Sequence, residues 1–293
     1  MRVIDFMKYK KLWFSISGAI LLIGLIFSFI VGGLNFGIDF TGGTSITVQI
    51  GKTFTVDEIR TISNKFDKEA IVTYGGANKD LAIIKTKVNL TNEQQAAVYA
   101  DFKEQFGIEQ TSILFESIGP VIGSELKKQA LLALLFSNLG ILLYVSLRFE
   151  WKFGLAAVLA LVHDVGMMLV VYVVLQIPVN VTFIAAILTI VGYSINDTIV
   201  VFDRMRENLK SNKKMDDNEL VNRSTSSTLA RSINTSMTTL ITILALYILG
   251  VPAIKDFALP LMLGILSGTY SSIFIASPLW VVLRKAFKPA VGR

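Results

Sequence analysis

The residues with the clearest chemical potential are polar groups inside long apolar stretches. Asn196 and Asp197 interrupt the run 181–202, which is otherwise long enough to cross a bilayer as a helix. A carboxylate at such a depth costs on the order of 3 kcal/mol or more, so it usually faces a bundle interior and handles protons or ions. A frayed helix end is the alternative, but the apolar run continues to Phe202. The pattern therefore favours an ion-handling carboxylate at Asp197.

A second costly insertion is the adjacent pair His163–Asp164, near the middle of the apolar run 153–175. The imidazole of histidine titrates near neutral pH, so the pair could form an additional proton relay. It could equally form a satisfied hydrogen-bond pair that fixes helix packing. The residues leave both interpretations open.

A polar stripe begins at the basic end of the run 232–250. Arg231, Thr235, Thr239 and Thr242 are separated by four, four and three residues, so they share one helix face. An arginine at a helix end can be a simple interfacial anchor. The hydroxyls that follow it favour a polar channel lining, because they can hydrogen-bond to water or to other helices.

The composition identifies a membrane protein. Of the 293 residues, 53% are hydrophobic, and the mean hydropathy is +0.59. The absence of cysteine and the single histidine exclude a disulfide framework, a thiolate metal site and a histidine-rich metal cluster. We find no nucleotide-binding motif, so we expect no metal, no cofactor, no enzymatic activity and no use of ATP by this chain.

Six apolar runs have the length of membrane-spanning helices. They cover residues 12–32, 127–147, 153–175, 181–202, 232–250 and 257–283. The first lacks a small-residue cleavage site and is interpreted as a retained helix rather than a signal peptide. The sequence therefore predicts a polytopic α-helical membrane protein with six transmembrane helices.

The distribution of basic residues predicts the orientation. Seventeen of the 28 lysines and arginines lie in the N-terminal tail, the 148–152 loop, the 203–231 loop and the C-terminal tail. The short loops on the other side carry only Lys255. By the positive-inside rule, both termini and the 203–231 loop are cytoplasmic. The net charge of +6 thus reflects topology and anionic lipid, and we expect no nucleic-acid partner.

Between the first two membrane helices lies one predicted extracytoplasmic domain, residues 35–126. Its pattern predicts strands at 44–50, 70–74, 80–88 and 112–118, and helices at 56–66 and 91–106. This βαββαβ order is that of a ferredoxin-like α+β fold. It divides the chain into residues 1–34, with the N-terminus and the first membrane helix, this domain, and residues 127–293 with the other five helices.

The segment GIDFTGGT, residues 37–44, joins the first membrane helix to that domain. Gly37, Asp39, Gly42 and Gly43 predict a tight, irregular backbone. Glycine-rich runs can also cradle phosphate, but this one lacks the Lys-Ser/Thr of a P-loop. A structural turn at the membrane surface is the favoured interpretation.

These motifs together resemble the SecF family, the smaller membrane subunits of the bacterial SecD–SecF protein-export complex. The resemblance rests on GIDFTGG, the HD pair, VGYSINDTIVVFDRMREN and ARSINTS, and it covers nearly the whole chain. The family belongs to the resistance–nodulation–division superfamily, whose members use the proton or sodium gradient. The resemblance implies ion-coupling roles for Asp197, Arg231 and Thr235, and we add the neighbouring Asn196.

The resemblance also implies partners and a location. A six-helix chain is half of a typical twelve-helix transporter of that superfamily, so a SecD-like subunit would supply the other half. The SecY/SecE/SecG channel, YajC, SecA and the translocating preprotein are the further implied partners, all at the bacterial cytoplasmic membrane. The implied function is gradient-driven promotion of preprotein export. Two alternatives remain open: half of a lipid or small-molecule exporter on the same scaffold, and a purely structural subunit.

Overall fold

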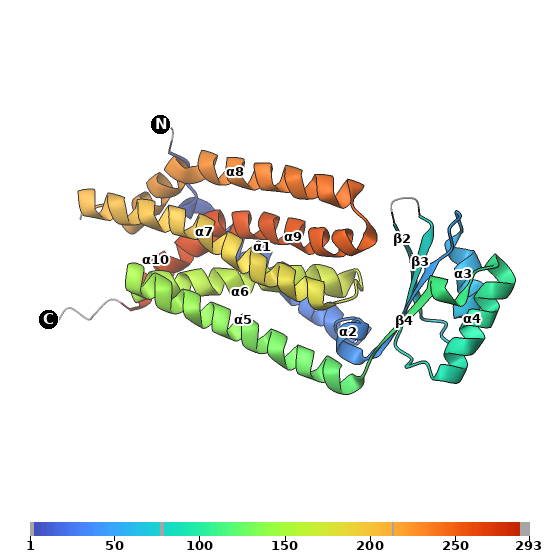
Figure 1. Cartoon of the computed structure of the whole chain (residues 1–293). Coiled ribbons are helices and arrows are strands. Elements are labelled where there is room, and N and C mark those ends of the chain that lie inside the picture. Colours follow the sequence, from blue (N-terminus) through green and yellow to red (C-terminus); the bar gives the residue numbers. More distant parts are fainter. Residues whose placement is uncertain (1–2, 77–78, 213, 288–293) are drawn as a thin grey trace.

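A computed structural model describes the chain except residues 1–2, 77–78, 213 and 288–293. A bundle of long helices occupies one end of the molecule and a small α+β domain the other (Figure 1). Six helical segments are long and apolar enough to cross a membrane. The fold is therefore the predicted polytopic helical architecture with one additional domain between its first two long helices.

The long helices follow the predicted apolar runs, and most of them extend beyond these runs at one or both ends. They are α1 (Lys10–Val31), preceded by the 3₁₀ turn η1 (Met7–Tyr9), then α5 (Pro120–Arg148), α6 (Trp151–Val174), α7 (Val181–Ser211), α8 (Asp217–Leu249) and α9 (Pro252–Ser271). The last membrane segment continues through η3, a π-helical turn at Ser272–Ala276, into α10 (Ser277–Ala286). The start of α1 and the end of α10 lie at the end of the bundle opposite the α+β domain (Figure 1).

Two predicted boundaries were wrong. The segment 203–231 is mostly helix rather than loop, because α7 continues to Ser211 and α8 begins at Asp217. The Asp216 side chain caps α8 by accepting a hydrogen bond from the Asn218 N–H, which holds the pKa of that carboxyl below its usual range. Similarly, α5 begins at Pro120, so the domain boundary expected at 126 falls inside a helix. Hydropathy detects contact with lipid and misses helix that continues beyond it.

The α+β domain has the predicted order of elements. Its strands are β1 (Gly43–Gln49), β2 (Ile71–Gly75), β3 (Leu81–Thr86) and β4 (Ile113–Ile118), and its helices are α3 (Val56–Ser63) and α4 (Asn92–Phe106). The strands form one antiparallel sheet in the order β2-β3-β1-β4. Capping boxes at Thr55–Glu58 and Thr91–Gln94 start the two helices. A separate hydrophobic core, distinct from that of the bundle, holds this unit together.

The glycine-rich segment fastens the domain to the bundle. It contains a short helical turn, α2 (Ile38–Thr41), which the sequence did not predict, followed by Gly42 and Gly43 at positive φ. A Cβ on Gly43 would lie 2.2 Å from the Thr86 carbonyl oxygen, so only glycine fits there. The Asp39 carboxylate accepts a hydrogen bond from the Val181 N–H at the start of α7 (2.9 Å). This supports the structural interpretation of the segment.

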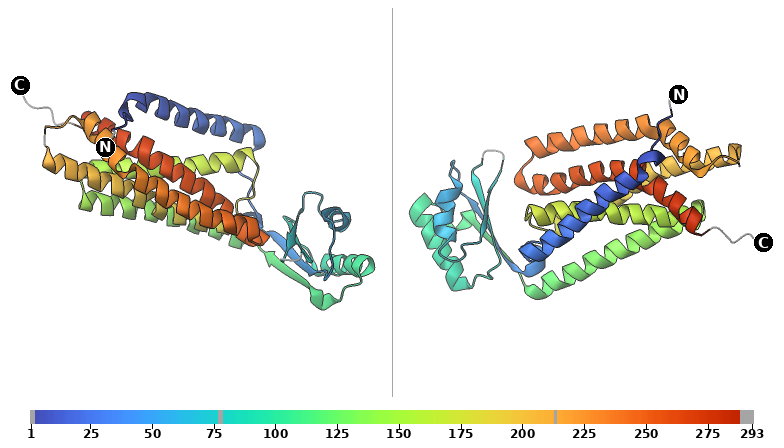
Figure 2. Two further views of the ribbon diagram at one scale, coloured as in Figure 1. Left: turned by 90° about the horizontal axis from the view of Figure 1, so that it is seen from above. Right: turned by 180° about the vertical axis from the view of Figure 1, so that it is seen from behind.

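Helices α6, α7 and the α9–α10 segment form the centre of the bundle, and α1, α5 and α8 surround it. In the most apolar 18 residues of each span, 44–56% of the residues are buried in the central spans and 6–17% in the peripheral ones. Helix α1 lies along the outside of the bundle in both views of Figure 2. In α9, Gly264 faces Ile190 and Gly268 faces Ser194, both on α7. These two glycines bring α9 and α7 into close contact.

We expect Gly264→Ala to destabilise the bundle, because its Cβ would lie 2.1 Å from the Cδ1 atom of the buried Ile190. Overpacking of this kind costs roughly 1–3 kcal/mol. The measurement is the thermal unfolding midpoint and membrane abundance of the variant. Gly18→Ala on α1, where a Cβ would meet nothing within 4 Å, is the control and should be neutral. Equal stability of the two variants would contradict the close packing of α9 on α7.

Candidate site at the two membrane carboxylates

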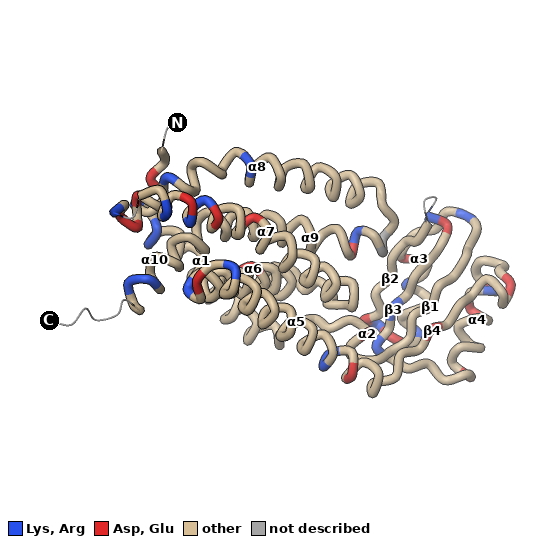
Figure 3. Tube along the Cα trace, turned by 60° about the vertical axis from the view of Figure 1, so that its left-hand side comes forward, with Lys and Arg blue, Asp and Glu red and all other residues tan. Residues whose placement is uncertain are grey.

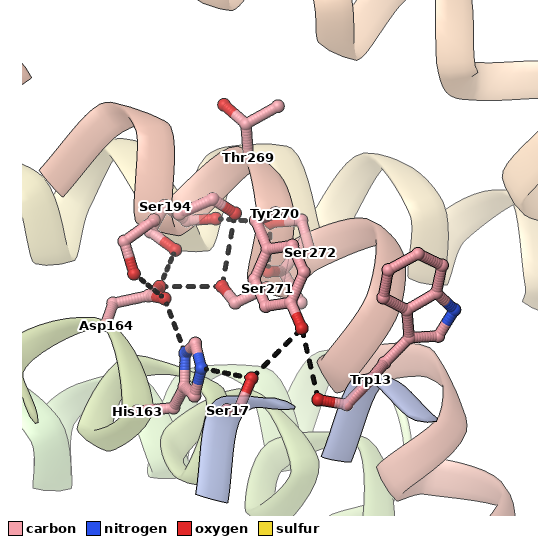
Figure 4. Close-up of polar contacts among 12 residues, drawn as sticks. Trp13, Ser17, His163, Asp164, Ser194, Thr269, Tyr270, Ser271 and Ser272 are labelled. Carbon is pink, nitrogen blue, oxygen red and sulfur yellow. Dashed lines mark hydrogen bonds and ion pairs between the residues drawn. The ribbon is translucent and has the colours of Figure 1, made fainter. Parts of the chain in front are cut away.

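Asp164 lies at the centre of a hydrogen-bond cluster formed by three helices. Its side chain is 1% exposed. The Ser194 hydroxyl of α7 and the Ser271 hydroxyl of α9 donate to Oδ2 at 2.7 and 2.8 Å, and Ser267 donates to Oδ1 at 3.0 Å (Figure 4). His163 Nδ1 lies 3.1 Å from Oδ1. With four partners on two oxygens, this carboxyl is fully satisfied as a hydrogen-bond acceptor.

His163 extends this cluster toward α1. Its Nε2 atom lies 3.0 Å from the Ser17 hydroxyl, which lies 3.0 Å from the Tyr270 hydroxyl (Figure 4). Tyr270 in turn donates to the Trp13 carbonyl oxygen. Gly24 of α1 permits this approach, because its backbone packs directly against Val170 of α6. The predicted His163–Asp164 pair is therefore buried and fully engaged in helix–helix contacts.

Asp197 has a different environment. It is only partly buried, and a single hydroxyl, that of Ser232 on α8, donates to its Oδ1 at 2.6 Å. Its Oδ2 atom is shielded from solvent and accepts no hydrogen bond from the described residues. A buried carboxylate oxygen without a donor is costly, so this group is incompletely solvated in the isolated chain. Of the two membrane carboxyls, Asp197 is the one with capacity for another partner.

The other predicted ion-coupling residues lie on the outer face of the chain. Asn196, Arg231 and Thr235 are exposed, and no ion pair within 4 Å joins Arg231 to Asp197 in the described part of the chain. Thr239 and Thr242 donate to carbonyl oxygens one turn earlier in α8. The predicted polar stripe thus exists as a continuous face, but this chain alone does not enclose it as a channel.

The sequence analysis missed the serines that complete the cluster. They are Ser194 on α7, Ser232 on α8, and Ser267, Ser271 and Ser272 on the α9–η3 segment. Ser267 and Ser271 are four residues apart and so share a helix face, a spacing that the sequence contains. Serine is common in membrane helices, however, and only the partner helices reveal which hydroxyls meet a carboxylate.

The π turn η3 begins at Ser272, directly after Ser271. Such turns insert one extra residue into a helix and occur frequently at functional sites. Phe274 of this turn packs on the other side against Trp13, with ring centroids 4.3 Å apart. The irregular part of the helix therefore lies between the carboxylates and the N-terminal helix.

A separate cavity of about 680 Å³ lies between the α+β domain and the adjacent ends of the helices. Lys85 and Asp67 line it from the domain, and Tyr172 and Asp256 line it from the bundle. Neither Asp164 nor Asp197 contributes to it. Among the described residues, no group of three or more His, Asp or Glu side chains could hold a metal ion.

The fold and the site define a class: a multi-pass helical membrane protein with ionisable groups placed between its helices. Two family models match, "Protein export membrane protein SecD/SecF, C-terminal" over residues 98–286 and "SecD/SecF GG Motif" over residues 27–53. The chain therefore belongs to the SecD/SecF family of protein-export membrane proteins.

Individual relatives agree with this assignment. The chain is 41% identical to the protein translocase subunit SecF of Calditerrivibrio nitroreducens, over 97% of this chain and 95% of that protein. It is 37% identical to the protein translocase subunit SecDF of Bacillus subtilis, over 94% of this chain but 38% of that protein. The crystal structure of SecDF, a translocon-associated membrane protein from Thermus thermophilus, superimposes with a TM-score of 0.83 at 38% identity and covers 97% of this chain and 39% of that one.

The contrast between the two carboxyls predicts different effects of neutralising them. Asp164→Asn replaces the carboxyl group to which three serine hydroxyls donate hydrogen bonds. Hydrogen bonds to charged groups contribute about 1.5–3 kcal/mol each to stability. We expect lower thermal stability of the purified protein. Asp197→Asn should leave stability unchanged, because Asn retains an acceptor for Ser232. Equal unfolding midpoints for the two variants would show that Asp164 is not the more firmly held group.

Proposed function

We propose that this chain is a non-enzymatic accessory subunit of the Sec protein translocase. Together with a SecD-like partner, it would use the proton or sodium gradient to promote preprotein export across the membrane. The relatives described above support this proposal, because both are named as protein translocase subunits. The membership of an export family also argues against a lipid or small-molecule exporter half.

The observation that carries the proposal is the incomplete site at Asp197. Its carboxyl has an oxygen without a donor in the described part of the chain, and the neighbouring Asn196, Thr235 and Arg231 are exposed on the bundle surface. Polar groups on a membrane-spanning surface are costly unless another protein surface covers them. A second helical half, packed on α7 and α8, would enclose these groups and create a polar path.

The partner is proposed to be SecD-like. In the Bacillus subtilis and Thermus thermophilus relatives, the matched region is less than two fifths of a longer SecDF chain. The remaining length of those chains is sufficient for a second membrane half. The SecY/SecE/SecG channel, SecA, YajC and the translocating preprotein are the further partners that we propose, with anionic lipid around the basic end of the bundle.

We further propose the bacterial cytoplasmic membrane as the location, with both termini in the cytoplasm and the α+β domain outside. Lysines and arginines gather at the end of the bundle that carries the two termini (Figure 3). This asymmetry is the one that the positive-inside rule associates with the cytoplasmic side.

The proposed mechanism makes Asp197 the ion carrier. Its carboxyl would alternate between neutral and charged forms as ions pass along the polar face, and Arg231 would stabilise the charged form once the partner excludes water and lipid. Because α8 contributes both Ser232 and Arg231, a change at Asp197 acts directly on that helix. Movement of the helices would shift the external domains and pull the translocating chain outward.

The orientation can be tested by cysteine labelling, because the chain has no cysteine of its own. Lys79→Cys in the α+β domain should react with a membrane-impermeant maleimide in cells with a permeabilised outer membrane. Lys214→Cys, between α7 and α8, should react only after the inner membrane is opened. The reverse pattern would overturn the proposed orientation.

The carrier role predicts that Asp197→Asn inserts and binds its partner normally but reduces export to the gradient-independent level. Arg231→Met should have a similar effect. Asp203→Asn is the control: its pairing with Arg148 at 3.7 Å is largely exposed, so export should stay within about twofold. The assay is gradient-driven export in inner-membrane vesicles, with subunit abundance measured in parallel.

Full export by Asp197→Asn at normal abundance would refute the carrier role. Loss of the protein itself would instead indicate that Asp197 serves only the fold.

A further inference from the structure

Buried hydroxyls stand beside the two carboxyl groups, and neither the relatives' names nor the sequence pattern singles them out. Ser271 and Ser272 are consecutive, both are fully buried, and they stand at the junction of α9 and the π turn η3. The Ser271 hydroxyl donates a hydrogen bond to Asp164, as described above. Ser272 contacts α7 instead, at Ser194 and Thr198.

Ser272 is held less firmly than Ser271. Its hydroxyl lies 2.9 Å from the Thr198 hydroxyl and donates to the Ser194 carbonyl oxygen at 3.5 Å, at the limit of a hydrogen bond. These two contacts place it beside α7 at residues 194 and 198, three residues before and one residue after Asp197. Oδ2 of Asp197 has no donor among the described residues, and Ser272 supplies a buried hydroxyl on the facing segment.

We propose that Ser272 is a positioning residue for the ion carrier: its hydroxyl donates to the Ser194 carbonyl while Asp197 is neutral and turns to Oδ2 of Asp197 when that carboxyl is charged. This inference rests on the carrier role proposed above and adds the donor that the charged state requires. No covalent bond changes in the step, and the proton of the serine hydroxyl stays on its oxygen.

The residue before Ser272 is held in a fixed position. The Ser271 hydroxyl donates to Asp164, and the other three partners of Asp164 hold that carboxyl in place. The next residue can therefore turn without releasing the helix from α6. The π turn supplies the irregular backbone at that point, and hydrogen bonds to a charged acceptor are about twice as strong as neutral ones. The charged Asp197 carboxylate would therefore attract the Ser272 hydroxyl, and the irregular backbone would allow that side chain to turn toward it.

The test compares Ser272→Ala with the hydroxyl-retaining Ser272→Thr in the full complex with its SecD-like partner. Loss of a hydrogen bond to a charged group should reduce gradient-driven export about tenfold or more in Ser272→Ala. Ser272→Thr should restore export to within about threefold of the unaltered protein. Normal export by Ser272→Ala, or an equal defect in Ser272→Thr at normal abundance, would overturn the proposal.

Ser277→Ala is the matched control. Ser277 is also fully buried, one turn further along in α10, and its hydroxyl has no hydrogen-bond partner in the part of the chain that the structure describes. Its removal should change neither export nor abundance. A defect in Ser277→Ala equal to that in Ser272→Ala would show that this region responds to packing alone, and would overturn the positioning role.

A spectroscopic readout covers the case in which Ser272→Thr does not fold. Infrared difference spectra between low and high pH contain a carboxyl band that Asp197→Asn removes. That band should shift in Ser272→Ala and stay in place in Ser277→Ala, because only the former loses a donor to Asp197. An unshifted band in Ser272→Ala overturns this proposal alone, whereas full export by Asp197→Asn overturns the carrier role on which it rests.

Discussion

The arrangement of the bundle depends on one buried carboxylate, Asp164. Three serine hydroxyls from two other helices converge on it, and the adjacent His163 links it to α1. A charge without hydrogen-bond partners at this position would have a very high free energy in a medium of low dielectric constant, so the fold requires donors from the surrounding helices. The close contact of α7 with α9 through Gly264 and Gly268 places those donors within reach. Packing and polar satisfaction therefore specify the same geometry.

The second carboxyl group, Asp197, differs from Asp164 in its hydrogen-bond partners. Asp164 has four hydrogen-bond partners, whereas Asp197 has one donor among the described residues and an oxygen without any. A partly satisfied carboxyl can gain a further partner, such as an ion, a residue of another chain or a hydroxyl. The chain thus contains a fully hydrogen-bonded carboxyl on α6 and an incompletely hydrogen-bonded carboxyl on α7.

Sequence reasoning located both carboxylates because charge inside an apolar run is conspicuous, and it gave the βαββαβ order because helical and strand periodicities differ. It could not find Ser194, Ser271 or Ser272, since serine is neutral on a hydropathy scale and acquires a role only through residues on other helices. The π turn at Ser272–Ala276 was equally invisible, because its residues have the composition of ordinary α-helix. The helical parts of 203–231 were missed because their few buried apolar residues, among them Met205, Leu220 and Val221, stand among charged and polar ones, so the mean hydropathy stays below that of a membrane span. What the sequence encodes locally could be predicted; what depends on contacts between distant segments could not.

Helix α9 connects these features to the domain outside the bundle. Its first turns pack near β2 of the α+β domain, and its last turn ends at the serines that contact Asp164 and Thr198. Pro260 lies between these two ends of α9, and an interior proline removes one backbone hydrogen bond of the helix. The π turn after Ser271 adds a second irregular position at the end of the helix that carries the serines. The segment between the serines and the sheet is therefore not one regular rod, and a displacement at either end can be absorbed at Pro260 before it reaches the other.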